Sequence, residues 1–419
     1  MGRAALLLVD LQRDTLHPNG AGTRRGLGKI EPRAATRLIG VWQQLADAMR
    51  AAGRPVVWVS TAFRPDYRDA AVAAPWLERR RAGGDFLVEG TWGAELMDGL
   101  EQDPGDYVIV KKGHGAFQGT PLDRLLTNLD VEQCVIAGGG VADSVTETVR
   151  TGGILGYWTF AVEDALYPPD APELLSSGLR IFPRGQLMSM DKVLASASGP
   201  HPIVEEEPGE DPCALLIVDM QNDFISPERP AVVYGGSEPI PADKRERMLR
   251  NARDVAAAVR ARGWPVVNVK VVRRADNLDD VHGKGAWVGE GLPPSVTHVA
   301  QGTWGAEIVA ELQPEPDDFV VEKKGASGFG LTHLHRLLRN LHVRRCLLAG
   351  GSTTGCVRAT MFDGIALGYD VTVVSDATYP PDSPHVEFLA QWCAVKSTRE
   401  VLAELPPLAP GAAARVLGG

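Results

Sequence analysis

The chain repeats itself, and this internal duplication limits its fold more than any other feature of the sequence. A shift of 212 positions, which carries Ser144 onto Cys356, superimposes residues 135–148 on residues 347–360. Near the start of each half the shift is 209, and it carries Asp10 onto Asp219. A repeat of about 200 residues is far longer than a solenoid unit and suits one α/β domain. The chain of 419 residues is therefore predicted to hold two domains in tandem. Further matching segments are Lys111–Gly113 with Lys323–Gly325, Gly90–Glu95 with Gly302–Glu307, and Tyr167–Asp170 with Tyr379–Asp382.

Within each half, apolar runs alternate with segments of helical periodicity. Ala4–Val9 is a continuous apolar run, typical of a strand buried on both faces, and helical spacing follows up to a stop at Gly53. This alternation predicts an α/β fold class, with two tandem three-layer α/β/α domains, each around a mostly parallel sheet. The predicted domains are 1–197 and 213–419. Residues 198–212, rich in Pro, Gly and Glu, form the predicted linker.

Composition narrows the function classes and the partners. The net charge is −10, without the clustered Lys and Arg of a nucleic-acid-binding surface. No apolar run approaches the roughly 20 residues that span a bilayer, and the N-terminus lacks the shape of a signal peptide. The five cysteines show no regular spacing, which favours a reducing compartment. We therefore expect a cytoplasmic protein with a small-molecule substrate as its partner, and neither nucleic acid nor membrane.

The segment Leu347–Thr360 carries the most specific chemical signal. It has the pattern of a buried strand, a Gly-rich turn and a helix whose first turn contains Cys356. Unpaired backbone N–H groups and the positive end of the helix dipole favour a thiolate at such a position. The same N–H groups can bind the oxyanion that forms when the sulfur attacks a carbonyl carbon.

Two further ionisable residues are predicted to meet Cys356 at one edge of the second sheet. Asp219 and Lys323 each come at the end of an apolar strand, and the carboxyl ends of parallel strands share an edge. There Asp219 could accept the thiol proton, while Lys323 could hold the carboxylate and favour the thiolate. A structural ion pair between Asp219 and Lys323 is the alternative, because buried acid–base pairs also occur outside active sites.

These residues lie in motifs that resemble the isochorismatase-like cysteine hydrolases, a family that includes N-carbamoylsarcosine amidohydrolase and nicotinamidase. The motifs are Val218–Phe224, Lys323 with Phe329 six residues later, and Gly350–Val357, and the resemblance covers nearly the whole of both halves. It implies a catalytic triad of Asp219, Lys323 and Cys356. It also implies a cis peptide at Gly351–Ser352 and an oxyanion hole at Ser352 and Cys356.

The second half departs from the metal-binding members of that family. Nicotinamidases carry an Asp-x-His-x-His cluster where this chain has residues 272–277 and the isolated His282. His333 and His335, two residues apart on a predicted helix, point to different faces. We therefore expect no metal and no cofactor, and a metal-independent amidohydrolase acting on a small amide or N-carbamoyl substrate. Candidates to line its pocket, each with ordinary packing or solvation as the alternative, are Phe224, Arg273, Arg274, Trp304 and Phe329.

The first half retains Asp10 and Lys111 but has Ser144 at the nucleophile position. A hydroxyl is much harder to deprotonate than a thiol, so this copy is predicted to be degenerate and to pair within the chain with the active half. Further homo-oligomerisation stays open. Two alternatives remain: a vinyl-ether hydrolase of the isochorismatase type using Asp10 and Lys111, and a non-catalytic scaffold formed by both halves.

Overall fold

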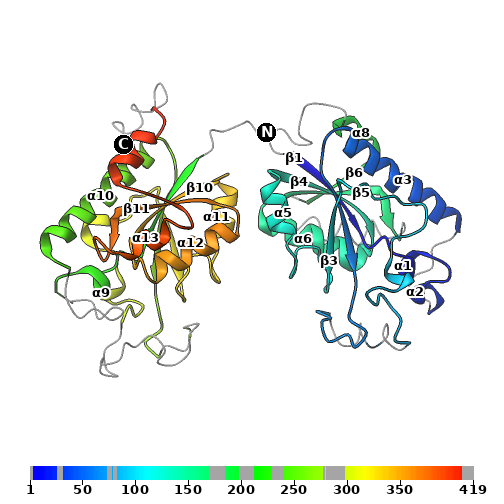
Figure 1. The fold of residues 1–419 in the computed structure, drawn as a ribbon, viewed down its shortest axis with the longest axis horizontal. Coiled ribbons are helices and arrows are strands. Elements are labelled where there is room, and N and C mark those ends of the chain that lie inside the picture. Colours follow the sequence, from blue (N-terminus) through cyan, green and yellow to red (C-terminus); the bar gives the residue numbers. More distant parts are fainter. Residues whose placement is uncertain are drawn as a thin grey trace. The chain divides into compact units, whose positions relative to one another are not determined.

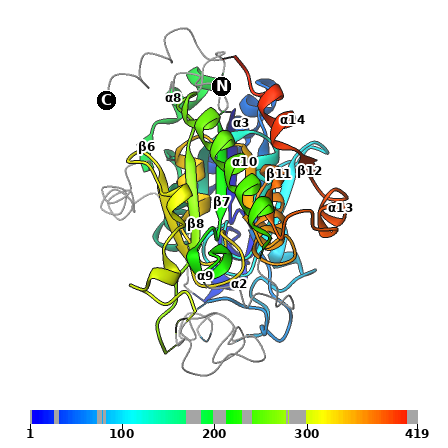
Figure 2. The same cartoon turned by 90° about the vertical axis from the view of Figure 1, so that its left-hand side faces the viewer.

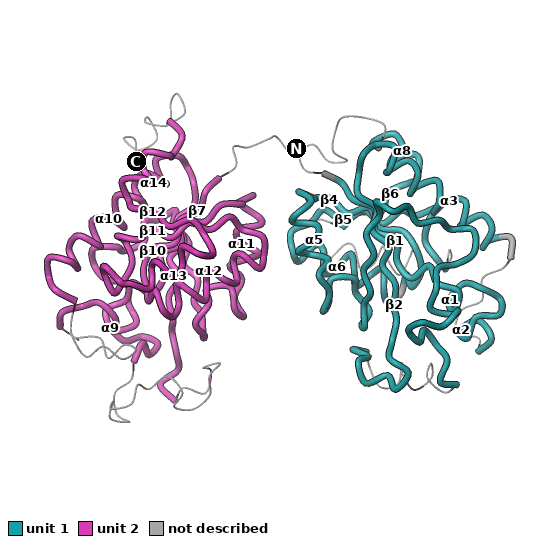
Figure 3. The backbone as a smooth tube through the Cα atoms, in the orientation of Figure 1, with its two compact units in different colours: residues 1–208 teal, residues 209–419 magenta. Residues whose placement is uncertain are grey.

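The computed structural model divides the chain into two compact units, residues 1–208 (unit 1) and 209–419 (unit 2) (Figure 3). It describes residues 3–25, 32–72, 78, 83–168, 185–197, 212–228, 240–276, 279 and 298–407. The predicted linker 198–212, except for Pro212, and His282 lie outside the described residues. The division between the units falls within the linker range.

Unit 1 is built on one six-stranded sheet in the order β3-β2-β1-β4-β5-β6, with every neighbouring pair parallel. Its strands are β1 (Arg3–Val9), β2 (Val56–Thr61), β3 (Tyr107–Lys111), β4 (Val131–Gly139), β5 (Trp158–Tyr167) and β6 (Gly185–Met188). Its helical segments are α1 (Arg13–Leu16), α2 (Ala21–Arg24), α3 (Pro32–Ala51), η1 (Trp92–Ala94), α5 (Leu122–Asn128), the π-helical turn η2 (Val141–Val145), α6 (Thr146–Leu155) and α8 (Met190–Ala197).

Unit 2 repeats this sheet in the order β12-β11-β10-β7-β8-β9, again parallel throughout. Its strands are β7 (Cys213–Val218), β8 (Val266–Val271), β9 (Phe319–Lys323), β10 (Arg345–Gly351), β11 (Asp370–Tyr379) and β12 (Ala394–Lys396). Its helical segments are α9 (Asn222–Ile225), α10 (Ala242–Arg260), η3 (Trp304–Ala306), η4 (Ala310–Leu312), α11 (Leu334–Asn340), α12 (Cys356–Ala366), α13 (His385–Leu389) and α14 (Thr398–Glu404).

Helices cover both faces of each sheet, which confirms the predicted three-layer α/β/α fold. In unit 2, α10 packs on one face, and α11 and α12 pack on the other (Figure 1). Figure 2 shows α10 lying over the sheet, with α14 close to it. In unit 1, α3 covers one face, and α5 and α6 cover the other. Among the described residues, no helix combines the length and the apolar character needed to cross a membrane.

The strand order determines where a site can form. The chain leaves the central pair β1 and β4 in opposite directions along the sheet, and β7 and β10 do the same in unit 2. In open parallel sheets, ligands bind at such a switch point, outside the carboxyl ends of the strands. The central strands are buried on both faces, and all six residues of β7 are buried. Polar side chains that follow these strands are therefore held against a rigid core.

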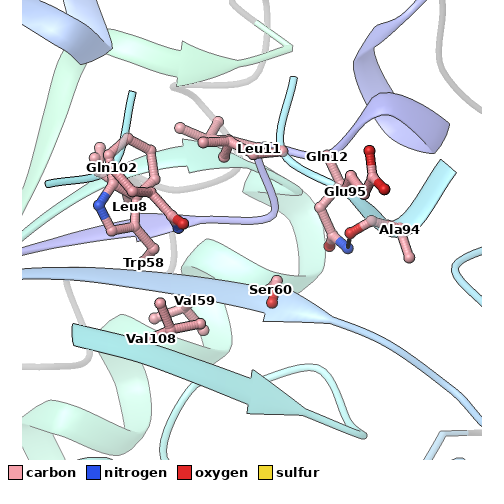
Figure 4. A pocket seen from close by; sticks show the side chains of 11 residues that line it. Leu8, Leu11, Gln12, Trp58, Val59, Ser60, Ala94, Glu95, Gln102 and Val108 are labelled. Carbon is pink, nitrogen blue, oxygen red and sulfur yellow. Dashed lines mark hydrogen bonds between the residues drawn. The ribbon is translucent and has the colours of Figure 1, made fainter. Parts of the chain in front are cut away.

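Unit 1 contains a cavity of about 330 Å³ beside β1, β2 and β3 (Figure 4). The indole of Trp58 forms part of its wall, and its Nε1 donates a hydrogen bond of 2.7 Å to Asp106 Oδ2. Asp10, Lys111 and Ser144 are not among the residues that line it, so this cavity is not the counterpart of the nucleophile's site. The lining residues are Leu8, Leu11, Gln12, Trp58, Val59, Ser60, Ala94, Glu95, Leu96, Gln102 and Val108.

Candidate active site

The carboxyl ends of β7, β9 and β10 bring Asp219, Lys323 and Cys356 together in unit 2. Asp219 follows β7, Lys323 ends β9, and Cys356 begins α12 after β10. The Lys323 Nζ lies 2.8 Å from Asp219 Oδ2, and the Cys356 thiol lies close enough to both side chains for each to shift its pKa. All three residues are buried, with Cys356 only 5% exposed. The ion pair that the sequence left as an alternative therefore exists, and it lies beside the sulfur.

The backbone around Asp219 holds its carboxylate in place. Asp219 has a φ of 50°, in the left-handed region that a residue with a side chain rarely adopts. The backbone N–H of Val271 donates to Asp219 Oδ1 at 3.0 Å. Gln221 reinforces this arrangement, because its side-chain amide accepts from the Val271 N–H and donates to the Val271 carbonyl. The carboxylate thus has one oxygen fixed by the backbone and the other paired with Lys323.

The protonation of Cys356 differs from the prediction. Burial in the core beside α12 and the nearby Asp219 carboxylate raise the pKa of Cys356 to about 12, although Lys323 acts to lower it. The prediction of a resting thiolate is therefore wrong, because desolvation and Asp219 outweigh the favourable charges. Burial acts to lower the pKa of Lys323, but Asp219 and Cys356 together raise it above its usual value. The free site holds a thiol beside a cationic lysine.

The turn that precedes Cys356 presents two backbone N–H groups. The Gly351–Ser352 peptide, where the family resemblance implied a cis bond, is cis. The carbonyl of Ser352 accepts from the N–H groups of Gly355 and Val357 at 3.1 and 3.0 Å. In the part of the chain that the structure describes, the backbone N–H groups of Ser352 and Cys356 have no protein acceptor. These are the two donors predicted to bind an oxyanion.

The five candidate pocket residues lie in different environments. Arg273 is buried just after β8. Phe224 is buried and packs edge-on against His298, with ring centroids 4.8 Å apart. Phe329 is buried and stacks on Tyr369 at 5.4 Å, in the core that also contains Cys356.

The other two candidates, Arg274 and Trp304, lie at the surface. The Arg274 side chain is 60% exposed and pairs with Asp276. Trp304 is 43% exposed, and its carbonyl accepts from the Asn222 side chain. Solvation and a local ion pair therefore explain the position of Arg274 without a ligand.

Unit 1 gathers the corresponding residues but connects them differently. Lys111 Nζ lies 3.0 Å from Asp10 Oδ2 and 3.2 Å from Ser144 Oγ. Thr61 also enters this network, because its hydroxyl donates to Asp10 Oδ1 and accepts from Lys111 Nζ at 2.7 Å. In unit 2 the matching position at the end of β8 is Val271, which has no hydroxyl. Lys111 therefore divides its hydrogen bonds between Ser144 and an additional acceptor.

A carboxylate also occupies the anion-binding position of unit 1. Asp143 Oδ1 accepts the backbone N–H of Ser144 at 2.7 Å, which is the donor equivalent to the Cys356 N–H. A Cβ added to Gly140 would lie 2.6 Å from this Asp143 oxygen and 3.1 Å from Ser144 Oγ, so the acid and the hydroxyl converge. The shift of 212 positions aligns Asp143 with Gly355. Unit 1 is thus blocked for oxyanion binding as well as lacking the sulfur.

Four residues that define these sites were not predicted from the sequence: Thr61, Asp143, Val271 and Tyr379. The first three were visible as differences between the aligned halves, since each differs from its counterpart. Tyr379 was visible as part of a repeated Tyr-Pro-Pro-Asp segment. Their effects depend on side-chain directions, which alignment alone does not provide.

We expect that transferring the sulfur alone will not make unit 1 reactive. In a Cys356→Ala background, Ser144→Cys combined with Asp143→Gly should be alkylated by iodoacetamide about tenfold faster than Ser144→Cys alone. Removing an adjacent carboxylate lowers the pKa of a thiol by about one unit or more. The rate is measured by mass spectrometry of the peptide that contains position 144. Equal rates in the two variants would show that Asp143 does not block the site.

Comparison with known proteins identifies the family of the chain. The model of the isochorismatase domain matches residues 4–173 and 213–394, so the chain belongs to the isochorismatase family and contains its domain twice. A probable inactive nicotinamidase from Arabidopsis thaliana is 36% identical over 170 residues, 39% of this chain and 79% of that protein. The ureidoacrylate amidohydrolase RutB of Methylorubrum extorquens is 30% identical over 189 residues, 42% of this chain and 74% of that protein.

Among solved structures, the N-carbamoylsarcosine amidase of Thermoplasma acidophilum is similar, with 24% identity and a TM-score of 0.37. The match covers 45% of this chain and 97% of that one. Within the described residues, no group of three or more His, Cys, Asp or Glu side chains is arranged to hold a metal ion.

Proposed function

We propose that unit 2 is a metal-independent cysteine amidohydrolase that cleaves the C–N bond of a small amide or N-carbamoyl compound. The observation that carries this proposal is the buried ion pair of Asp219 and Lys323, 2.8 Å apart, beside the buried Cys356 thiol whose pKa both of them shift. A scaffold does not require a thiol that touches a buried acid–base pair. Family membership and the similarity to an amidohydrolase support the same class of reaction.

In the proposed first step, the Cys356 sulfur attacks the carbonyl carbon of the substrate as its proton passes to Asp219. This transfer is needed because the pKa of the thiol is raised to about 12. The Lys323 ammonium stabilises the negative sulfur as it forms. The N–H groups of Ser352 and Cys356 stabilise the tetrahedral oxyanion.

In the proposed second step, the C–N bond breaks and the departing nitrogen takes the proton held by Asp219. From a simple amide the nitrogen leaves as ammonia, and the acyl group stays on sulfur as a thioester. Asp219 next removes a proton from water, whose oxygen attacks the thioester. Collapse releases the carboxylic acid, and the proton returns to sulfur. Lys323 keeps the carboxylate oriented throughout.

The reaction should be found by screening small amides and ureido acids for ammonia release. With an active compound in hand, Asp219→Asn should lower turnover by about 10²-fold or more, since it removes the base. The matched change Asp10→Asn in unit 1 should leave turnover within about twofold. If Asp10→Asn abolishes turnover and Asp219→Asn does not, the vinyl-ether chemistry of unit 1 is the better account.

Unit 1 is proposed to be catalytically degenerate in the same scheme. Asp143 on the Ser144 N–H, and Thr61 between Asp10 and Lys111, support this assignment. Pairing of the two units within the chain, further oligomerisation and a cytoplasmic location stay predictions from the sequence.

A further inference from the structure

We propose that Tyr379 is a positioning residue that fixes the base Asp219 relative to the oxyanion-binding turn before Cys356. This inference rests on the proposed function. Tyr379 ends β11 and is buried. Two of its hydrogen bonds reach the backbone segments that carry the reacting groups.

The first contact is with the base. The Tyr379 hydroxyl donates a hydrogen bond of 3.1 Å to the backbone carbonyl of Asp219. Asp219 has its left-handed φ of 50°, so a rotation of this one residue would redirect the carboxylate. A hydroxyl fixed to the carbonyl resists that rotation.

The second contact is with the turn before Cys356. The Tyr379 carbonyl accepts from the Thr353 N–H at 3.0 Å, and β11 is in register with β10 through Gly351 and Tyr379. The phenol ring lies directly against Gly351, where an added Cβ would collide with it. Tyr379 therefore contacts both the base that follows β7 and the turn that follows β10.

Unit 1 supplies the comparison. Tyr167 has the same place at the end of β5, in register with Gly139. A Cβ on Gly139 would lie 3.9 Å from the nearest atom of the Tyr167 ring, so the ring stands further from the turn. Within the described residues, the Tyr167 hydroxyl makes no hydrogen bond to Asp10, whose carboxylate is held by Thr61 instead.

The two units thus fix their aspartates in different ways. Unit 1 uses the Thr61 hydroxyl, which also accepts a hydrogen bond from Lys111. Unit 2 has Val271 at that position. There the Val271 N–H holds the Asp219 carboxylate, and the Tyr379 hydroxyl holds the Asp219 backbone carbonyl. Lys323 therefore donates no hydrogen bond to a side-chain hydroxyl at this position, and its charge is available to stabilise the sulfur anion.

Tyr379→Phe tests the proposal, since it removes only the hydroxyl. We expect kcat for the amide identified in the screen to fall about tenfold with KM nearly unchanged, because a misplaced base slows the chemical step. Alkylation of Cys356 by iodoacetamide at fixed pH should become several-fold faster. The Asp219 carboxylate raises the pKa of the thiol, so a loosened carboxylate leaves the sulfur more under the influence of Lys323.

The matched control is Tyr167→Phe, which should change neither quantity. A general loss of stability would also speed alkylation of Cys346, a free and buried cysteine of the same unit, so faster alkylation of Cys356 with Cys346 unchanged identifies positioning. Unchanged kcat and unchanged alkylation in Tyr379→Phe would overturn the inference. The proposed function is tested separately by Cys356→Ser, in which hydrolysis should disappear whatever the effect of Tyr379→Phe.

Discussion

Replacing Cys356 by serine should abolish hydrolysis, with turnover reduced by at least about 10³-fold. A serine hydroxyl is much harder to deprotonate than a thiol, and the Asp219 carboxylate already has to remove a proton from a thiol whose pKa is about 12. The chain itself contains the serine version of this arrangement, with Ser144 beside Lys111 and Asp10. Steady-state ammonia release measures the effect.

The matched control for this change is Ser144→Ala in unit 1. It should retain full turnover, because the proposed chemistry takes place only in unit 2. Retention of more than about a tenth of the activity in Cys356→Ser would show that the sulfur is not the nucleophile. Loss of activity in Ser144→Ala would show that unit 1 takes part in catalysis.

Replacing Lys323 by methionine should reduce both turnover and stability. The Asp219 carboxylate is buried, and without Lys323 it would lose the cation 2.8 Å away. Removing one partner of a buried ion pair costs about 3–5 kcal/mol, so the unfolding free energy of unit 2 should fall by about that amount. Turnover should fall by about 10²-fold or more in the fraction that remains folded, because the cation that stabilises the sulfur anion is absent.

Lys111→Met is the corresponding change in unit 1, where Lys111 pairs with Asp10 at 3.0 Å. It should destabilise unit 1 by a similar free energy and leave turnover unchanged. Urea unfolding, followed by limited proteolysis to assign each transition to a unit, measures the stability effects. Equal losses of activity in the two variants would contradict the assignment of chemistry to unit 2 alone.

Much of the fold followed from the sequence because its signals are local and were repeated. Apolar runs such as Ala4–Val9 and Cys213–Val218 have the pattern of strands buried on both faces, and the structure forms them as β1 and β7. The duplication then required the same order of elements in both halves. The predicted mostly parallel sheets are parallel throughout.

The gathering of Asp219, Lys323 and Cys356 was also predictable, because parallel strands bring their carboxyl ends to one edge. The protonation of the sulfur was not. Favourable local features, a helix N-terminus and a lysine, predicted a thiolate, whereas burial and the contact with Asp219 raise the pKa of Cys356. Those two effects depend on tertiary packing, which no single stretch of sequence displays.

The state of the first half was predictable only in part. The serine at position 144 indicated a degenerate copy, but the block by Asp143 depends on the direction of its side chain. The position of Tyr379 against Gly351 likewise depends on the register of β10 and β11. Interactions between side chains that are distant in sequence decided these details.

The central claim is that Cys356 forms a covalent bond with the substrate, and mass spectrometry of the enzyme quenched with acid during turnover tests it most directly. The peptide that contains Cys356 should carry the mass of the acyl group, the modification should disappear in Cys356→Ser, and the peptide that contains Ser144 should stay unmodified. Turnover without any adduct on the Cys356 peptide, under conditions that preserve thioesters, or an adduct on Ser144, would contradict the account.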